Sequence, residues 1–167
     1  MTELVQLHLV NMLIREYRRS DAIAITKLFY QTVRSVNLKD YSENQVRAWA
    51  PMIPDAEIWH SRMCQRCTFV AEENGKVIGF AELENDGHLD MFYCRHDFIR
   101  RKVGTEIYAA IESKAVGLGL ERIFADVSIT ARPFFEHCGF VTMRKQTVTR
   151  SRVELTNFRM EKRLRVR

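Results

Sequence analysis

The spacing of apolar residues along the chain predicts five helices. They span residues 18–36, 41–51, 54–65, 102–119 and 130–139. In the first and the fourth, apolar residues return every three or four positions, which is the period of a helix with one buried face. Ser42 and Gln45 form a capping box at the start of the second helix, and Pro54 stands just before the third.

Shorter stretches rich in β-branched and aromatic residues predict seven strands. They span residues 12–17, 67–73, 76–85, 87–95, 121–129, 140–148 and 152–162. Asn74-Gly75, between the second and third of these, is a strong signal for a two-residue hairpin loop. The order of the elements predicts an α/β (α+β) fold in which a mixed sheet carries helices on both faces.

Length and composition predict one folded domain. The chain has 167 residues, of which 46% are hydrophobic and 28% charged, and no stretch approaches the ~18 consecutive apolar residues that a membrane span requires. We expect an N-terminal extension at 1–11 and a single domain over 12–167. Because the N-terminus has neither early Lys or Arg nor a small-residue cleavage site, we expect a cytoplasmic protein.

The formal net charge of +5 would attract polyanions, either nucleic acid or a phosphate-rich small molecule. Basic residues concentrate at 100–102 and in the C-terminal MEKRLRVR, but no zinc-finger or RNP-type motif accompanies them. Charge alone does not choose between these partners. A nucleic-acid-binding protein therefore stays open as a minor alternative.

The four cysteines include one CxxC pair, Cys64 and Cys67, which has the spacing used for zinc or redox chemistry. No second CxxC or HxxxH is present to complete a four-ligand zinc site, and Cys67 opens a strand-like run rather than a helix. We expect free thiols in a reducing compartment and no metal site.

Three cations, Arg100, Arg101 and Lys102, immediately precede the predicted fourth helix. Positive charge opposes the positive end of the helix dipole, so each cation costs a few tenths of a kcal/mol there unless an anion is bound. A bound pyrophosphate would make the three positive charges favourable instead of costly. Three solvated cations on a surface loop explain the same residues and stay open as the alternative.

The same segment carries a family resemblance. The pattern [QR]xxGx[GA] of motif A in the GNAT (Gcn5-related N-acetyltransferase) superfamily falls on residues 99–104. DVSITARPFFEHCGF is similar to the second motif of the family, and VELTNFRMEK to its closing strand. The element order matches from residue 12 to about 163. YSENQVRAWA, LDMFY, SITARPFFE and TNFRM resemble the small bacterial YafP-like branch.

The resemblance implies a mostly antiparallel central sheet of six to seven strands, with the fourth and fifth strands splayed around acetyl-coenzyme A. It also implies an N-acetyltransferase in which an amine attacks the thioester directly within a ternary complex. The residues that would bind coenzyme A lie on the fourth strand, the basic loop and the second motif. They are Phe92, Tyr93, Cys94, Arg100, Arg101, Lys102, Val103, Gly104, Thr105, Ser128, Phe134 and Phe135.

Two positions of motif A depart from the family pattern, because Ile99 replaces Gln or Arg and Lys102 replaces Gly. If Lys102 has a positive φ, its side chain costs ~1–2 kcal/mol. A charge-assisted bond from its ammonium to a phosphate, at ~1.5–3 kcal/mol, would offset that cost.

The second motif also departs from the family. Many members have a Tyr four residues after the motif Ala to protonate the leaving thiolate, and here Phe135 stands four after Ala131. Phenylalanine has no proton to give. We therefore expect Phe134 and Phe135 to pack against the pantetheine arm or in the core.

The amine that attacks must lose a proton, and the strand at 87–95 offers two groups for that task. Strand alternation puts His88, Asp90 and Phe92 on one face and Tyr93 on the other. Asp90 stands where several members of the family carry a carboxylate. We therefore expect Asp90 to act as the base, directly or through a water, with His88 as its neighbour or substitute. A solvated strand carboxylate is the alternative.

The resemblance places the acceptor near the first two helices and the final strands. The aromatic residues Phe29, Tyr30, Tyr41 and Trp49 would then lie near its entrance, although the same residues at helical spacing also fit a core. We expect the acceptor to be a small-molecule amine or a protein amino group. We expect no nucleic-acid or membrane partner, and a homodimer stays open.

The main alternative is a degenerate GNAT domain that binds coenzyme A as a sensor or interaction module without turnover. The missing Gly at Lys102 and the missing Tyr at Phe135 favour it, whereas the DMFY and ARPFFE segments favour the enzyme.

Overall fold

The computed structural model describes residues 12–165 and contains two antiparallel sheets. The predicted extension at 1–11 lies outside the described residues. The first sheet has the order β1-β2-β3-β4, with strands β1 (Met12–Glu16), β2 (Cys67–Glu73), β3 (Lys76–Leu83) and β4 (Leu89–Cys94). The second has the order β5-β7-β6, with strands β5 (Arg122–Ser128), β6 (Val141–Arg150) and β7 (Val153–Arg163). All seven predicted strands are thus present.

The five predicted helices are also present. They are α1 (Ala22–Ser35), α2 (Glu43–Trp49), α3 (Ala56–Met63), α4 (Val103–Gly117) and α5 (Arg132–His137). Three short 3-10 turns, which the sequence patterns do not predict, are η1 (Arg19–Asp21), η2 (Val36–Lys39) and η3 (His96–Phe98). The predicted capping box is confirmed, because the Gln45 N–H donates to the Ser42 hydroxyl and the Ser42 N–H donates to the Gln45 side chain. Among residues 12–165, no helix has both the length and the apolar character that a membrane span requires.

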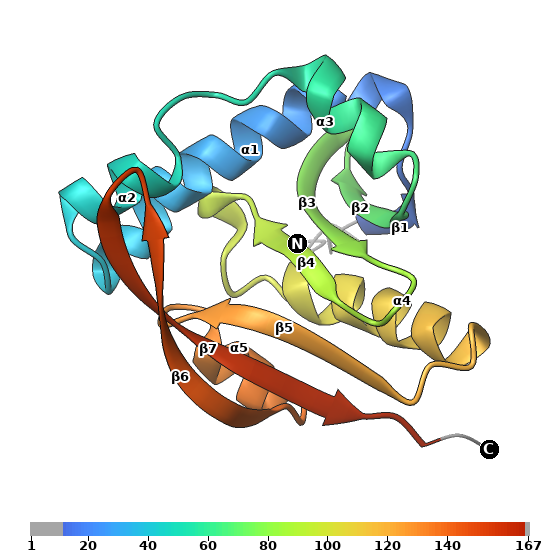
Figure 1. Ribbon diagram of the computed structural model, residues 1–167. Coiled ribbons are helices and arrows are strands. Elements are labelled where there is room, and N and C mark those ends of the chain that lie inside the picture. The colour runs from blue at the N-terminus through green and yellow to red at the C-terminus, as the bar shows by residue number, and fades with distance from the viewer. Residues whose placement is uncertain (1–11, 166–167) are drawn as a thin grey trace, which may run out of the picture.

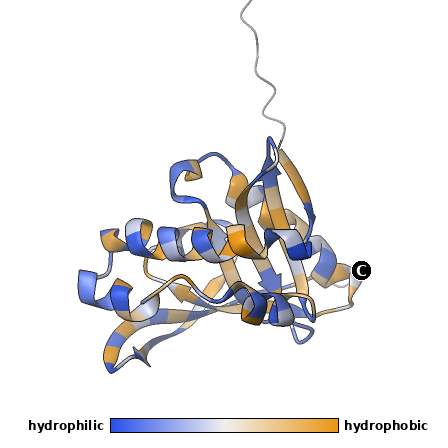
Figure 2. Ribbon diagram, turned by 90° about the horizontal axis from the view of Figure 1, so that it is seen from above, coloured by the Kyte–Doolittle hydropathy of each residue, from blue (hydrophilic) through white to orange (hydrophobic). Residues whose placement is uncertain are grey.

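Helices cover both faces of the first sheet, as predicted (Figure 1). Alternate strand residues face opposite ways, so Phe80 packs with α1 and α3 while Ala81 packs with α4. Hydrophilic and hydrophobic residues alternate along the helices, which gives each helix an apolar side for the sheet (Figure 2). The result is two core clusters, one on each side of β3.

The expected central sheet of six to seven strands is divided in two, because β4 and β5 form almost no ladder. One parallel bridge joins His88 to Phe124, and the Phe124 N–H donates to the Gly87 carbonyl over 3.0 Å. Beyond this bridge the two strands diverge (Figure 1). This arrangement confirms the predicted splay of the fourth and fifth strands.

Gly87 stands where the two strands meet, and it has no room for a side chain. Its φ is +92°, and a Cβ atom there would lie 2.4 Å from the carbonyl oxygen of Arg122 on β5. Gly119, after α4, also has a positive φ (+72°), but a Cβ at that position meets no atom within 4 Å. Both glycines therefore have a positive φ, but only Gly87 lies so close to another strand that a side chain would clash.

We expect Gly87→Ala to destabilise the fold more than Gly119→Ala. Both substitutions place a side chain at positive φ, which costs about 1–2 kcal/mol. Only the first also forces β4 and β5 apart, and that overpacking adds about 1–3 kcal/mol. Urea denaturation of both variants measures the difference in unfolding free energy. Equal losses for the two variants would contradict the close approach at Gly87.

Candidate functional site

A groove with a cavity volume of about 310 Å³ lies between β4 and β5. It runs from the basic loop before α4 to the start of α5. Most of the residues predicted to bind coenzyme A line it, namely Phe92, Tyr93, Cys94, Arg100, Lys102, Val103, Gly104, Thr105, Ser128, Phe134 and Phe135. The splay of the two strands therefore brings these residues together from distant parts of the chain.

Arg101 is the exception among the predicted cofactor residues. Its guanidinium pairs with Glu73 at 3.2 Å and lies over the ring of Phe98, with 4.4 Å from its Cζ to the ring centroid. Arg101 is not among the residues that line the groove. Its side chain therefore belongs to the outer surface of the loop, and only Arg100 and Lys102 bring their charge to the groove.

The basic loop holds two residues in the left-handed conformation that ordinarily favours glycine. Arg100 has φ +64° and Lys102 has φ +63°. Lys102 is the N-cap of α4, and its side chain does not cap the helix. The first helical hydrogen bond runs from the Glu106 N–H to the Lys102 carbonyl. The amides of residues 103–105 precede that bond, and those residues line the groove. Left-handed residues next to free helix amides form the kind of concavity that binds anions.

Gly104 keeps the groove open beside these amides. A Cβ atom at this position would lie 3.2 Å from the ring of Phe134 and 3.5 Å from the ring of Phe92. Any side chain would push the aromatic wall into the groove. The free amides, the cations and this narrow wall together fit a thin ligand with a phosphate group at one end.

Aromatic side chains form the wall of the groove near α5. Phe135 is only 3% exposed and packs edge to face against Phe92, Phe134 and Phe140. It therefore serves as part of the core, as expected for a residue without a proton to give. The nearby Cys94 thiol is neutral, because burial raises its pKa to about 12.

A second cavity, of about 370 Å³, adjoins the groove on the α1 and α2 side of β4. Of the predicted acceptor residues, Phe29, Tyr41 and Trp49 line this second cavity. Tyr30 does not line it and lies instead beneath the guanidinium of Arg34, 5.4 Å from Cζ to the ring centroid. The residues common to both cavities are Trp49, Asp90, Tyr93, Asp126 and Ser128.

Tyr41 has a structural task in addition to its place in the cavity wall. Its hydroxyl donates to the Thr156 carbonyl on β7 over 2.6 Å and accepts from the Ile129 N–H at the end of β5 over 2.9 Å. Burial raises the pKa of this hydroxyl. Tyr41 thus ties the helical layer to the second sheet.

The predicted alternation along β4 is wrong at Asp90. A register shift in the β3–β4 ladder pairs Leu83 with Leu89 and Glu82 with Met91, which leaves Asp90 as the extra residue of a bulge. Asp90 consequently does not share a simple face with Phe92, and it lines both cavities together with Tyr93. Bulges often re-aim a side chain at a site, and here the bulge brings a carboxylate to the junction of the two cavities.

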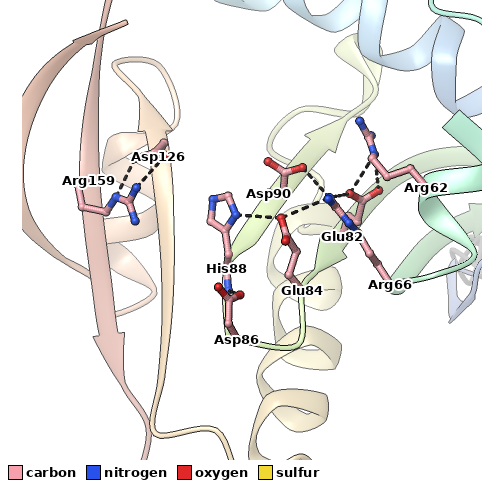
Figure 3. A network of polar contacts seen from close by, with 9 residues as sticks. All are labelled: Arg62, Arg66, Glu82, Glu84, Asp86, His88, Asp90, Asp126 and Arg159. Atoms are coloured by element: carbon pink, nitrogen blue, oxygen red, sulfur yellow. Dashed lines mark hydrogen bonds and ion pairs between the residues drawn. The ribbon is translucent and has the colours of Figure 1, made fainter. Parts of the chain in front are cut away.

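Arg66, which the sequence patterns did not single out, binds three carboxylates beside this junction (Figure 3). Its Nη1 lies 2.8 Å from Asp90 Oδ2, 3.3 Å from Glu84, and also pairs with Glu82. Glu82 is fully buried, and burial raises its pKa against the opposing effect of the nearby guanidiniums, Arg62 first and then Arg66. Arg66 therefore fixes one Asp90 oxygen and provides positive charge for a group of three acids.

His88 is held by Glu84, one of the three carboxylates that Arg66 binds. Its Nδ1 lies 3.0 Å from Glu84 Oε1 (Figure 3). Its ring stacks on Phe124 with 5.1 Å between centroids. If Nδ1 donates to the carboxylate, Nε2 carries the lone pair. His88 lines the second cavity but not the groove, so Asp90 is the closer of the two predicted groups to the junction.

Glu84, His88 and Asp90 bring three donor atoms within 4.8 Å of one another, which is compatible with a metal ion. However, the Arg66 guanidinium already pairs with both carboxylates. A cation added there would be repelled by Arg66, so the donor set does not favour a metal.

Asp126 is the second carboxylate at the junction, and it comes from β5. Arg159 on β7 holds it through two bonds of 2.8 and 3.2 Å (Figure 3). The Gln146 side chain also donates to it, over 2.6 Å. Asp126 was not among the predicted site residues. The available signal was a charged residue between the apolar Ala125 and Val127, because strand alternation turns it away from the core that these two residues enter.

Known proteins share this sequence and architecture. The family model described as "Acetyltransferase (GNAT) domain" matches residues 37–162. The uncharacterized N-acetyltransferase YafP of Escherichia coli (strain K12) is 30% identical over 152 residues, which are 90% of this chain and 95% of that protein. The crystal structure of a GCN5-related N-acetyltransferase from Rhodopseudomonas palustris has a TM-score of 0.86 and 32% identity, covering 91% of this chain and 95% of that chain.

More distant structures share the fold. PaiA N-acetyltransferase from Thermoplasma acidophilum, in complex with coenzyme A, has a TM-score of 0.76 and 18% identity, covering 92% of this chain and 99% of that chain. YncA from Salmonella typhimurium, with its cofactor acetyl-CoA, has a TM-score of 0.72 and 17% identity, covering 93% of this chain and 95% of that chain. With the family model and the two nearer relatives, these structures confirm the resemblance drawn from the motifs: the chain belongs to the GNAT family of N-acetyltransferases, in its YafP-like branch.

Proposed function

We propose that the chain transfers an acetyl group from acetyl-CoA to an amine by direct attack within a ternary complex. The observation that carries this proposal is the meeting of two cavities between β4 and β5, with the carboxylate of Asp90 at their junction. One cavity leads to the cationic loop before α4, and the other is walled by aromatic residues. The junction is therefore where a thioester from one side would meet an amine from the other.

The groove residues fit coenzyme A. PaiA and YncA, which share the fold, are described with coenzyme A and acetyl-CoA respectively, and this supports the assignment. The amides of residues 103–105 and the cations of Arg100 and Lys102 would hold the pyrophosphate. The open edge of β4 at residues 92–94 would pair with the amides of the pantetheine arm.

The two strained cations support phosphate binding beyond what free amides offer. Each left-handed residue costs about 1–2 kcal/mol, and glycine would remove that cost. A charge-assisted hydrogen bond to a phosphate contributes about 1.5–3 kcal/mol, which outweighs the strain. We therefore assign Lys102 as a ligand of the pyrophosphate and not only as the N-cap of α4.

Asp90 would take the proton from the incoming amine, directly or through a water. Arg66 holds Asp90 Oδ2 at 2.8 Å, which orients the carboxylate and leaves Oδ1 for the amine. His88, supported by Glu84, stands on the acceptor side and would pass the proton outward. Acetyl-CoA supplies the acetyl group as a thioester, so the amine nitrogen gains the new amide bond, the carbon–sulfur bond breaks, and coenzyme A leaves as the thiolate.

The leaving thiolate needs no protein acid. A thiol has an ordinary pKa near ~8.5, so leaving it ionised at pH 7 costs only about 2 kcal/mol. Phe135 gives the thiolate an apolar wall and no proton.

The four free cysteines suit a reducing compartment, which supports a cytoplasmic location.

The first test separates an enzyme from a domain that only binds coenzyme A. We expect coenzyme A to raise the melting temperature of the protein, and the rise to grow with the logarithm of the coenzyme A concentration above Kd. We also expect thiol release from acetyl-CoA to depend on an added amine, with a broad amine panel as substrates. Thermal stabilisation without turnover of any amine would instead favour the sensor or interaction module.

We expect Lys102→Gly to stabilise the free protein slightly or leave it unchanged, yet to weaken coenzyme A binding about ten-fold or more. Relief of strain explains the first effect, and loss of the ammonium–phosphate bond explains the second. Thermal unfolding and calorimetric titration with coenzyme A measure the two effects separately. Arg101→Gln is the matched control, because it removes the same charge from a side chain that faces Glu73. Unchanged or tighter binding by Lys102→Gly would mean that the backbone amides alone hold the phosphate.

We expect Asp90→Asn to lower kcat by about 100-fold or more and to leave coenzyme A affinity unchanged, because general base catalysis contributes about 10²–10⁴-fold. We expect His88→Gln to have a smaller effect. Steady-state kinetics at saturating acetyl-CoA measure both variants. The exposed Asp40, which lines neither cavity, provides the control variant Asp40→Asn. A normal kcat for Asp90→Asn would remove Asp90 from the mechanism.

A further inference from the structure

Acetyl transfer to a plain amine leaves one charged residue of the acceptor cavity without a task. Arg150, at the end of β6, lines this cavity and not the cofactor groove. Two other arginines of the second sheet have partners, since Arg159 pairs with Asp126 and the Arg144 Nε donates to Gln146 over 3.2 Å. Arg150 is exposed, and within residues 12–165 its guanidinium has no ion pair or hydrogen bond. A cation that lines a cavity without a protein partner is free to pair with an anionic group of a ligand.

Arg150 is an exposed residue of the cavity wall, and its positive charge reaches the residues at the junction. Burial raises the pKa of Tyr93, and the positive charge of Arg150 is one of the influences that oppose this rise. Tyr93 lies at the junction with the cofactor groove. The guanidinium is therefore within electrostatic range of the place where the amine would react.

The opposite end of the cavity offers oxygen atoms on three strands. Asp90 and Asp126 line the junction from β4 and β5, and Asn157 lines the cavity from β7. Asn157 is paired across the ladder with Ser128, another junction residue. Its side-chain oxygen is buried and has no hydrogen-bond partner in the described part of the chain. A primary ammonium has three N–H donors and no acceptor, so it can pair with acceptor oxygens such as these.

Apolar side chains also contribute to the wall of this mostly polar cavity. Phe29, Trp59 and Met91 contribute side chains to its wall, and its volume is about 370 Å³. A cavity of this size takes one small molecule with a hydrophobic body rather than a folded segment of another protein.

We infer that the acceptor is an amino acid: a primary amine that also carries a carboxylate, with an apolar side chain. This inference rests on the acetyl transfer proposed above and names the substrate class of the same site. The amine lies among Asp90, Asp126 and Asn157, next to the thioester, and the carboxylate binds Arg150 in a charge-assisted pair. A protein N-terminus or an amine without the acid group leaves Arg150 to water and lacks this pair, so the site prefers a ligand that carries the carboxylate.

Matched ligand sets test the acid group directly. Each set contains an apolar amino acid, its amide and the corresponding amine without the carboxyl group, for phenylalanine, leucine and methionine. Binding is measured by calorimetry on protein saturated with coenzyme A, which requires no turnover, and initial rates are measured with acetyl-CoA. We expect at least one amino acid to bind about ten-fold or more tightly than its amide and its decarboxylated amine.

Variants at Arg150 connect that preference to the residue. We expect Arg150→Gln to raise Kd and KM for the amino acid about ten-fold or more, to leave those of the amide nearly unchanged, and to preserve kcat and coenzyme A affinity. Arg150→Lys should retain part of the preference. Arg152→Gln, at an exposed position of the same β6–β7 turn, is the control and should behave as the wild type.

The outcomes separate this inference from the proposed function. Equal or tighter binding of the amides or decarboxylated amines, the same loss for all three ligands in Arg150→Gln, or no binding by any ligand would overturn the amino acid acceptor. If amino acids bind through Arg150 but no acetyl group is transferred, acceptor recognition stands and the proposed transfer fails.

Discussion

The separation of β4 from β5 is the constraint on which the rest of the structure depends. Neighbouring strands ordinarily continue their ladder, because buried backbone amides and carbonyls need hydrogen-bond partners. Here the ladder stops after the bridge between His88 and Phe124. Gly87 allows the two strands to touch at that one point, and the rings of Phe92 and Phe134, with centroids 5.3 Å apart, line the opening beyond it. An open strand edge can accept an extended ligand in place of a missing strand.

Strain in the basic loop complements the open edge. The left-handed Arg100 and Lys102 are costly for the free chain, and such residues persist where the surrounding structure imposes them, commonly at ligand sites. The loop is continuous with α4, whose Val103 and Ile107 are buried in the core against the first sheet. Packing of α4 therefore fixes the direction of its free amides, and the same packing keeps the groove wall at Gly104 in place. Core burial and the shape of the groove are thus coupled through one helix terminus.

Much of this could be read from local sequence patterns. Among residues 12–165, periodicity predicts the five α-helices and the seven strands because each of these elements buries one face. The capping box of Ser42 and Gln45 is a contact between neighbours in sequence. The motif at residues 99–104 is also local in sequence, so it could predict which residues lie near the groove. The alternation at Asp90 could not, because a bulge depends on how β3 and β4 pair and not on the composition of either strand. Arg66 lies 24 residues from Asp90 and Arg159 lies 33 residues from Asp126, and no local spacing indicates such pairs.

Positive and negative groups alternate along the two adjoining cavities, and this order would orient the substrates in the site. Arg100 and Lys102 place cations in the loop, carboxylates lie at the junction, and Arg150 adds a cation that has no partner among residues 12–165. The junction acids do not carry their full charge outward, because Arg66 and Arg159 pair with them from behind. These carboxylates consequently offer oriented hydrogen-bond acceptors, and the paired arginines offset much of their negative charge. An ammonium held by such paired carboxylates is more easily converted to the neutral amine than one held by isolated acids, and only the neutral amine can attack a thioester. In the proposed complex, phosphate, amine and carboxylate would each meet a group of opposite sign, so the charges that bind the two substrates also determine which end of the acceptor faces the thioester.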